Sequence, residues 1–258
     1  MDIGDGQRPH RARERLLRQH RVRRSVGPGE ARAGQRGRRY QSVTTLRPHA
    51  AAAGVTADAT RLIAFGDAFF PIVLTLLVIE IHKPDAAPGG LAQALAAAWA
   101  SYAAFALAFV YVGVIWLNHH GLFRQVARVD RGLNGINLGI LGTAALIPFP
   151  TGVLAEALQS GNTADQRAAV VLYGVFAALM SAAWAPIFPY LERHRERLAP
   201  AVPGGYFRAQ RSRPWFGAAA YGLAIVAGTI GSPWLAVVIF LLIVLYHAWT
   251  SEGFGTWA

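Results

Sequence analysis

The charged residues of this chain are gathered into clusters, and long uncharged stretches separate the clusters. Residues 132–155, 168–191 and 214–251 contain no Asp, Glu, Lys or Arg, and Asp85 is the only such residue between Pro84 and Arg124. Apolar runs of about 18 or more residues are typical of membrane spans, because a helix satisfies its own backbone polar groups in lipid. The chain is therefore predicted to be an all-α membrane protein.

The uncharged stretches predict six transmembrane helices. Four of them are continuous and cover residues 62–81, 91–117, 133–155 and 168–191. A single helix over 214–251 would be about 57 Å long, about twice the thickness of the hydrocarbon core of a bilayer. Because Gly231-Ser232-Pro233 is a turn signal near its middle, this stretch is predicted to form two spans, residues 215–230 and 234–249.

The distribution of the 25 basic residues predicts the orientation. Fourteen Arg precede Leu62, three lie between the second and third spans, and six lie between the fourth and fifth, so 23 of the 25 share one side. Lys83 and Arg167 lie on the other side. Since basic residues favour cytoplasmic segments, both termini are predicted to be cytoplasmic.

The remaining composition divides the chain into three parts. Residues 1–57 are rich in Arg, Gly, Ala and Pro, and they are predicted to be a disordered cytoplasmic tail. An alternative is that this tail contacts anionic lipid or nucleic acid. Residues 58–251 form the six-span domain, and residues 252–258 are a short C-terminal tail. No nucleic-acid partner is expected, because the other basic residues follow membrane topology. The chain has no Cys, which excludes disulfides and thiolate metal sites.

The first span differs from a simple membrane anchor because it contains polar residues. Asp67 and Glu80 lie near its two ends, Thr75 lies near its middle, and Pro71 lies inside it. An ionised side chain at the centre of a membrane helix costs about 2.5–3.5 kcal/mol on insertion scales, so such residues usually face protein or water. The first span is therefore the first place to look for a functional site.

Helical periodicity divides this span into two faces. Ile72, Leu76 and Ile79 fall within about 60° of one another around the helix, and Thr75 lies about 60° from Ile72. Asp67 lies about 140° from Ile72, away from this stripe. Such a stripe is more often a packing face than a pore lining, so its spacing alone leaves both interpretations open.

Three sequence motifs resemble the transmembrane protein 175 family of potassium channels. The first is Arg61-x-x-x-Phe65-Gly66-Asp67, followed by Ile72, Thr75-Leu76-Leu77 and Ile79-Glu80. The second and third are Trp116-Leu117-Asn118-His119-His120 and Pro148-Phe149-Pro150-Thr151. The resemblance covers about residues 58–250, and its motifs occur in the family's order.

The resemblance implies a potassium-preferring cation channel, not an enzyme, in the plasma membrane of a prokaryote. Its partners would be the lipid bilayer, the other subunits of a homotetramer and permeant monovalent cations, with potassium ions and no other cofactor. The first helix of each subunit would line the pore, without a carbonyl selectivity filter. Carried over by position, the family pattern assigns the pore constriction to Ile72, Leu76 and Ile79 and the ion selectivity to Thr75. It assigns a structural polar network to Arg61, Phe65, Asp67, Trp116, Asn118 and His119.

Two residues of the first span depart from the family pattern. Gly66 stands where the family motif has Ser, so one hydroxyl of the network is absent. Pro71 lies directly before Ile72, and proline removes a helix hydrogen bond and tends to kink the helix. Both changes bear on the geometry of the pore helix.

Other functions have less support in the sequence than the channel. Thr229-Ile230-Gly231-Ser232-Pro233 lacks the second Gly of a carbonyl filter, and adjacent His119 and His120 point about 100° apart, which suits a metal ion poorly. No Gly-x-Ser-x-Gly motif of a hydrolase is present. The alternative is a proton-coupled secondary transporter that uses Asp67, Glu80 and His119. A purely structural membrane protein would not need Thr75 in an apolar stripe.

Overall fold

The computed structural model describes residues 56–251, and this part of the chain is helical, with no strand among the described residues. The longer helices are α3 (Ala57–Ile79), α5 (Trp99–Phe123), α6 (Arg131–Ala145), α7 (Pro148–Ser160), α8 (Thr163–Ala183), α11 (Arg213–Val226) and α12 (Pro233–Trp249). The shorter ones are α4 (Leu91–Ala97), α9 (Ile187–Arg193), η1 (Arg195–Arg197), α10 (Tyr206–Gln210) and the π-helical η2 (Ala227–Gly231). The predictions for residues 1–55 and 252–258 lie outside the described residues.

Five helical stretches among the described residues are long and apolar enough to cross a membrane. They are Ala57–Ile79, Trp99–Phe123, Arg131–Ser160, Thr163–Arg193 and Tyr206–Gly231. The apolar helix α12 follows them, but its 17 residues make it shorter. The chain is thus a multi-pass helical membrane protein, and the predicted split of residues 214–251 is confirmed at Ser232, between η2 and α12.

The helix ends differ from the predicted spans because a helix extends beyond its apolar part into polar caps. α3 begins at Ala57 rather than Leu62, because the hydroxyl of Thr56 accepts the backbone N–H of Ala59 at 3.4 Å. The predicted second span is divided at Ala98 into α4 and α5, and α5 continues to Phe123. Uncharged windows therefore locate the spans but not their ends.

Prolines explain two further interruptions. Pro148 and Pro150 lack a backbone N–H, and the chain turns between α6 and α7 at Leu146 and Ile147. Thr151, the last residue of the motif that begins at Pro148, is buried, and its hydroxyl donates to the carbonyl of Ile147 at 2.8 Å. Pro186 similarly precedes α9, where the fourth span breaks.

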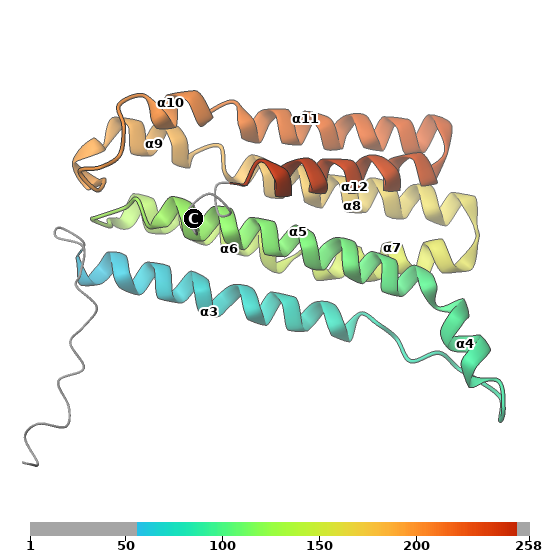
Figure 1. Cartoon of the computed structure of the whole chain (residues 1–258). Coiled ribbons are helices and arrows are strands. Elements are labelled where there is room, and N and C mark those ends of the chain that lie inside the picture. Colours follow the sequence, from blue (N-terminus) through green and yellow to red (C-terminus); the bar gives the residue numbers. More distant parts are fainter. Residues whose placement is uncertain (1–55, 252–258) are drawn as a thin grey trace, which may run out of the picture. The chain divides into compact units, whose positions relative to one another are not determined.

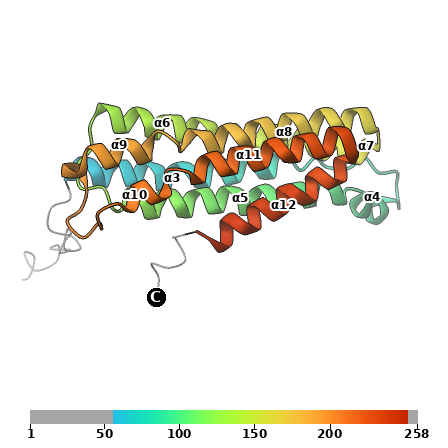
Figure 2. The same cartoon turned by 90° about the horizontal axis from the view of Figure 1, so that it is seen from above.

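The helices form a bundle in which α3 lies at one edge. α3 packs against α5, α6 and α7, whereas α5 also packs against α12 on its other side (Figure 1). Seen from above, α5 and α12 run along one side of the bundle and α6 and α8 along the other (Figure 2). α3 thus packs against the rest of the subunit from one side.

Glycines allow α8, α11 and α12 to pack closely at the opposite edge. A Cβ atom at Gly174 would lie 2.8 Å from Cδ1 of Ile225, and one at Gly228 would lie 2.7 Å from Cβ of Ala236. Small residues are common where membrane helices approach each other, because they let the backbones come near.

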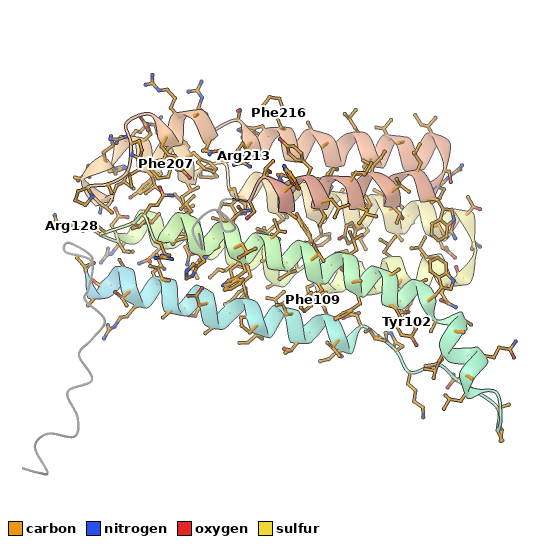
Figure 3. All side chains as sticks on the ribbon, in the orientation of Figure 1. Tyr102, Phe109, Arg128, Phe207, Arg213 and Phe216 are labelled. Carbon is orange, nitrogen blue, oxygen red and sulfur yellow. The ribbon has the colours of Figure 1, made fainter. Side chains whose placement is uncertain are left out.

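Charged residues gather at the end of the bundle where α3 begins. Arg128 and Arg213 lie toward this end in Figure 3. Asp130 caps α6, accepts the hydroxyl of Tyr190 at 2.5 Å and pairs with Arg197 at 2.9 Å. The backbone N–H of Leu133 and these two partners hold the pKa of the Asp130 carboxyl below its usual range. This cluster ties α6 to the segment after α9.

Candidate functional site

One face of α3 packs against the rest of the subunit. Ala59, Gly66, Phe70, Val73 and Leu77 form this face, and all of them are buried. They recur at helical spacing and contact the neighbouring helices α5, α6 and α7. This face fixes α3 to the bundle.

The other face of α3 remains open within the subunit. Ile72 is 59% exposed, Leu76 is 41% exposed and Ile79 is 70% exposed, and Thr75 lies exposed between them. All four residues that were predicted to line a pore therefore lie on this open face. Two adjacent leucines, Leu76 and Leu77, fall on different faces and have different surroundings.

The Thr75 side chain has a defined orientation. Its hydroxyl donates to the backbone carbonyl of Ile72 at 2.7 Å. A hydroxyl that donates its proton to a carbonyl still has oxygen lone pairs that can accept, so Thr75 presents an acceptor on the open face. α3 also runs as one α-helix past Pro71, which is exposed and cannot donate to the carbonyl of Asp67.

Asp67 is bonded to two side chains of α5. Trp116 Nε1 donates to Asp67 Oδ1 at 3.0 Å, and His120 Nδ1 lies 3.0 Å from Oδ1 and 3.1 Å from Oδ2. His120 was missed by the sequence analysis. The sequence spacing could have identified His120, because Trp116 and His120 are four residues apart and therefore share one face of α5.

His119 is buried beside α3 but bonds to a different helix. Its Nε2 lies 2.7 Å from Oδ1 of Asn137 on α6, and its ring packs on Phe123 with centroids 4.4 Å apart. A Cβ atom at Gly66 would lie 2.5 Å from Cε1 of His119 and 3.0 Å from Nδ1. The missing side chain at Gly66 therefore lets the His119 ring lie directly against the backbone of α3.

Besides His119, three residues of the predicted network do not join Asp67 within the subunit. Asn118 lies two positions after Trp116, about 200° around α5, and accepts the hydroxyl of Ser251 at 3.1 Å. Phe65 lies about 200° from Asp67 on α3 and is 52% exposed, and Arg61 is exposed as well. The structure thus gives two clusters, Asp67 with Trp116 and His120, and His119 with Asn137, in place of one network.

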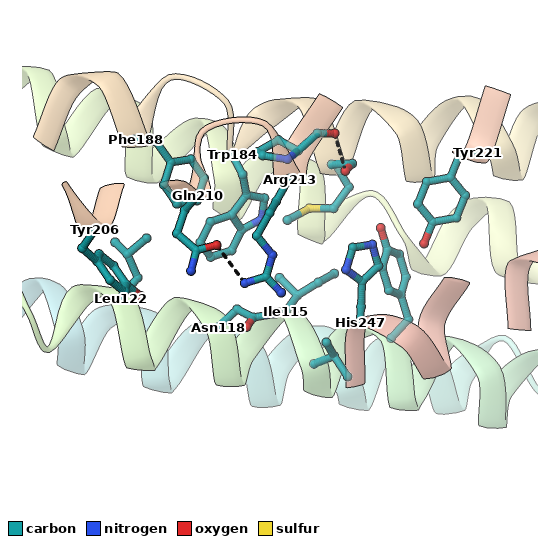
Figure 4. A pocket seen from close by; sticks show the side chains of 15 residues that line it. Ile115, Asn118, Leu122, Trp184, Phe188, Tyr206, Gln210, Arg213, Tyr221 and His247 are labelled. Atoms are coloured by element: carbon teal, nitrogen blue, oxygen red, sulfur yellow. Dashed lines mark hydrogen bonds between the residues drawn. The ribbon is translucent and has the colours of Figure 1, made fainter. Parts of the chain in front are cut away.

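Asn118 instead lines a cavity on the far side of α5 (Figure 4). The cavity has a volume of about 110 Å³ and lies among α5, α8, α11 and α12. Arg213 donates there to Oε1 of Gln210 at 3.0 Å, and Ser181 donates to the carbonyl of Pro214 at 2.9 Å. Asn118 is the single residue of the predicted site in this lining.

The structure does not bring together Asp67, Glu80 and His119, the three residues of the transporter alternative. Asp67 lies near the middle of α3 and Glu80 caps its C-terminal end, 13 positions later, or about 20 Å along the helix axis. Glu80 lies against Gly152 of α7, where a Cβ atom would collide with its carboxylate. Within the described residues, no group of three or more His, Asp or Glu could hold a metal ion.

Comparison with known proteins finds relatives that are named potassium channels. Residues 61–148 match the family model described as the endosomal/lysosomal potassium channel TMEM175. A potassium channel of Streptomyces collinus is 37% identical over 195 residues, which cover 75% of this chain and 93% of the relative. The crystal structure of a lysosomal potassium-selective channel TMEM175 homolog from Chamaesiphon minutus superposes with a TM-score of 0.66 at 30% identity, covering 76% of this chain and all of that one.

A vertebrate relative has a different name. The endosomal/lysosomal proton channel TMEM175 of Gallus gallus is 31% identical over 153 residues, which cover 54% of this chain and 30% of that protein. The described helices therefore correspond to the whole of the bacterial relative of known structure but to under a third of the vertebrate one.

Proposed function

Because the chain belongs to the family of the endosomal/lysosomal potassium channel TMEM175, a family of ion channels and not of enzymes, we propose that it is a potassium-preferring cation channel lined by α3. The observation that carries this proposal is the open face of α3. An apolar row with one hydroxyl is left exposed in the subunit, while the residues on the opposite face of the same helix are buried.

Four subunits around an axis would complete this face. Four copies of Ile72, Leu76 and Ile79 would form apolar rings, and such rings close a pore by excluding water. A closed symmetric assembly is also the common form of soluble oligomers built from one chain. The homotetramer thus gives the exposed row a place away from lipid, and the rings give the pore its constriction.

Thr75 is proposed to supply the potassium preference. Its hydroxyl proton is engaged by the carbonyl of Ile72, so four oxygen acceptors would face the axis between two apolar rings. Acceptors at this point could replace part of the hydration shell of a cation. Because a single ring offers few ligands, the preference for potassium over sodium is expected to be modest. Bacterial relatives are named potassium channels and the vertebrate ones proton channels. Proton permeation should therefore be measured together with potassium permeation.

The six-span topology completes the proposal. Five helical stretches have membrane length, and α12, which is about 26 Å long, would be the sixth span if it crosses the bilayer without a tilt. The Arg-rich end of the bundle would face the cytoplasm, so both termini are proposed to be cytoplasmic, in the plasma membrane of a prokaryote.

Recording from planar bilayers tests the function. The full chain is reconstituted with a potassium gradient, and native mass spectrometry of the same sample gives the number of subunits. We expect tetramers and unitary currents that reverse near the potassium equilibrium potential. Intact tetramers without current, or currents that follow the proton gradient alone, would refute a potassium channel.

A further inference from the structure

An apolar groove runs along the side of the subunit between α5 and α12, with α7 as its floor. Its volume is about 290 Å³, and all thirteen residues that line it are Ala, Val, Leu or Trp. Leu154 and Leu158 of α7 form the buried floor, whereas Val110 of α5 and Leu241 of α12 are 43% and 44% exposed at the rim. The groove therefore has an apolar lining and opens toward the outside of the subunit.

Two stacked tryptophans close one end of the groove. The rings of Trp99 and Trp234 have centroids 5.6 Å apart and an interplanar angle of 20°. Each is partly exposed; Trp99 is the first residue of α5 and Trp234 is the second residue of α12. Tryptophan is enriched at membrane–water interfaces, where its amphipathic ring lies at the level of the lipid headgroups. This end of the groove is thus placed at the membrane surface.

The length of the groove matches one leaflet of a bilayer. The lining extends over twelve residues of α5, from Trp99 to Val110, and over twelve of α12, from Trp234 to Leu245. Both walls begin at the tryptophan stack, and the first and last of twelve helical residues are about 17 Å apart along the axis. Half of the hydrocarbon core is about 15 Å thick. A groove of this length would end near the middle of the membrane.

The position of the groove points to lipid rather than to a second copy of the chain. α12 packs on the side of α5 opposite to α3, and α3 is the helix proposed to face the axis of the assembly (Figure 1). The groove also continues into the exposed apolar surface of α12, where Val238 is 51% and Leu242 is 58% exposed. This surface belongs to a chain that is embedded in a bilayer.

We propose that the groove binds one acyl chain of a bilayer phospholipid, with the headgroup beside Trp99 and Trp234. Alanines at positions 103, 104 and 106 leave the space that the acyl chain occupies. The filled groove restores the dispersion contacts that an empty apolar cavity lacks. The site depends on membrane embedding and on the proposed position of α3, but not on which ion the channel conducts.

Native mass spectrometry of the detergent-extracted full chain tests this site by counting the retained phospholipid. Ala106→Phe places a large side chain inside the groove, and Ala219→Phe places the same side chain on an exposed part of α11 outside it. We expect one phospholipid per subunit in the natural protein and in Ala219→Phe, and its loss in Ala106→Phe. No retained phospholipid in the natural protein, or equal retention in all three proteins, would overturn the proposal.

A second measurement remains useful if Ala106→Phe does not fold. The chain has no Cys, so a nitroxide at Val110→Cys reports on the groove rim alone, in vesicles of phosphatidylcholine and phosphatidylglycerol. We expect lipid-soluble oxygen to relax the nitroxide at position 110. In the same vesicles, we expect a spin-labelled phosphatidylcholine to show restricted motion. A label shielded from oxygen would show that protein covers the groove. A missing potassium current with lipid retained would instead count against the channel function and leave this site intact.

Discussion

The two faces of α3 are similar in composition but differ in their surroundings. Phe70, Val73 and Leu77 are at most 1% exposed, whereas Ile72 and Leu76, equally apolar, are 59% and 41% exposed. Hydrophobicity therefore does not separate a face that packs from a face that lines a pore. The neighbouring helices distinguish the two faces.

The largest effect is expected from two adjacent leucines. Leu77→Ala removes a fully buried side chain, so it should lower the free energy of unfolding by about 2–5 kcal/mol. Leu76→Ala on the open face should cost less than about 1 kcal/mol but should widen the pore and increase the current. Denaturant unfolding in detergent, together with bilayer recording, compares the two variants. Equal destabilisation would mean that both faces pack alike.

The close contact between Gly66 and His119 gives the next largest effect. Gly66→Ala introduces a Cβ atom 2.5 Å from Cε1 of His119, so we expect a destabilisation of about 1–3 kcal/mol. The loss should shrink when His119→Ala is also present, because the smaller side chain makes room. A double-mutant cycle of unfolding free energies measures this coupling, and additive effects would rule out the contact.

Changing the open face itself should alter conduction rather than stability. Ile72→Asn makes the proposed constriction polar, so water should enter it and the unitary conductance should rise several-fold. Val78→Asn is the matched control, because Val78 is 54% exposed but lies about 120° from Ile72 around the helix. An unchanged conductance for Ile72→Asn would place the constriction elsewhere.

The smallest effect is expected at the hydroxyl of Thr75. Thr75→Ala removes the acceptor, which should reduce the discrimination of potassium from sodium by about 0.5–1.5 kcal/mol. Thr75→Ser keeps the hydroxyl and should retain most of the preference. Reversal potentials in mixed potassium and sodium solutions provide the measurement. The same value for Thr75→Ala as for the natural protein would exclude the hydroxyl ring.

Much of the fold could be predicted from the sequence because the membrane imposes strong constraints. Uncharged stretches located the spans, and the turn at Ser232 between η2 and α12 was placed correctly. The division of the second span at Ala98 was not, because alanine has the highest helix propensity and gives no signal of a break. The ends of α3 also depend on a capping hydroxyl rather than on hydrophobicity.

The candidate site was predicted unevenly for a similar reason. Angles around a single helix placed Ile72 and Thr75 on one face and Asp67 on another, because those relations lie within α3. Partners on other helices depend on how the helices pack. His120 was not predicted to bond to Asp67, and Asn118 was wrongly grouped with it. The helical spacing could have corrected both, because His120 shares a face of α5 with Trp116 and Asn118 does not.

The most direct test of the central claim is to compare cysteine accessibility on the two faces of α3. The chain has no Cys, so single substitutions at Ile72, Thr75 and Leu76 can be compared with those at Val73 and Leu77. Silver ions, which react with thiols and enter narrow cation pores, are applied to conducting channels. We predict irreversible block at the three open-face positions and none at the two buried ones. Block at Val73 and Leu77, with the open-face variants conducting unchanged, would contradict a pore lined by this face of α3.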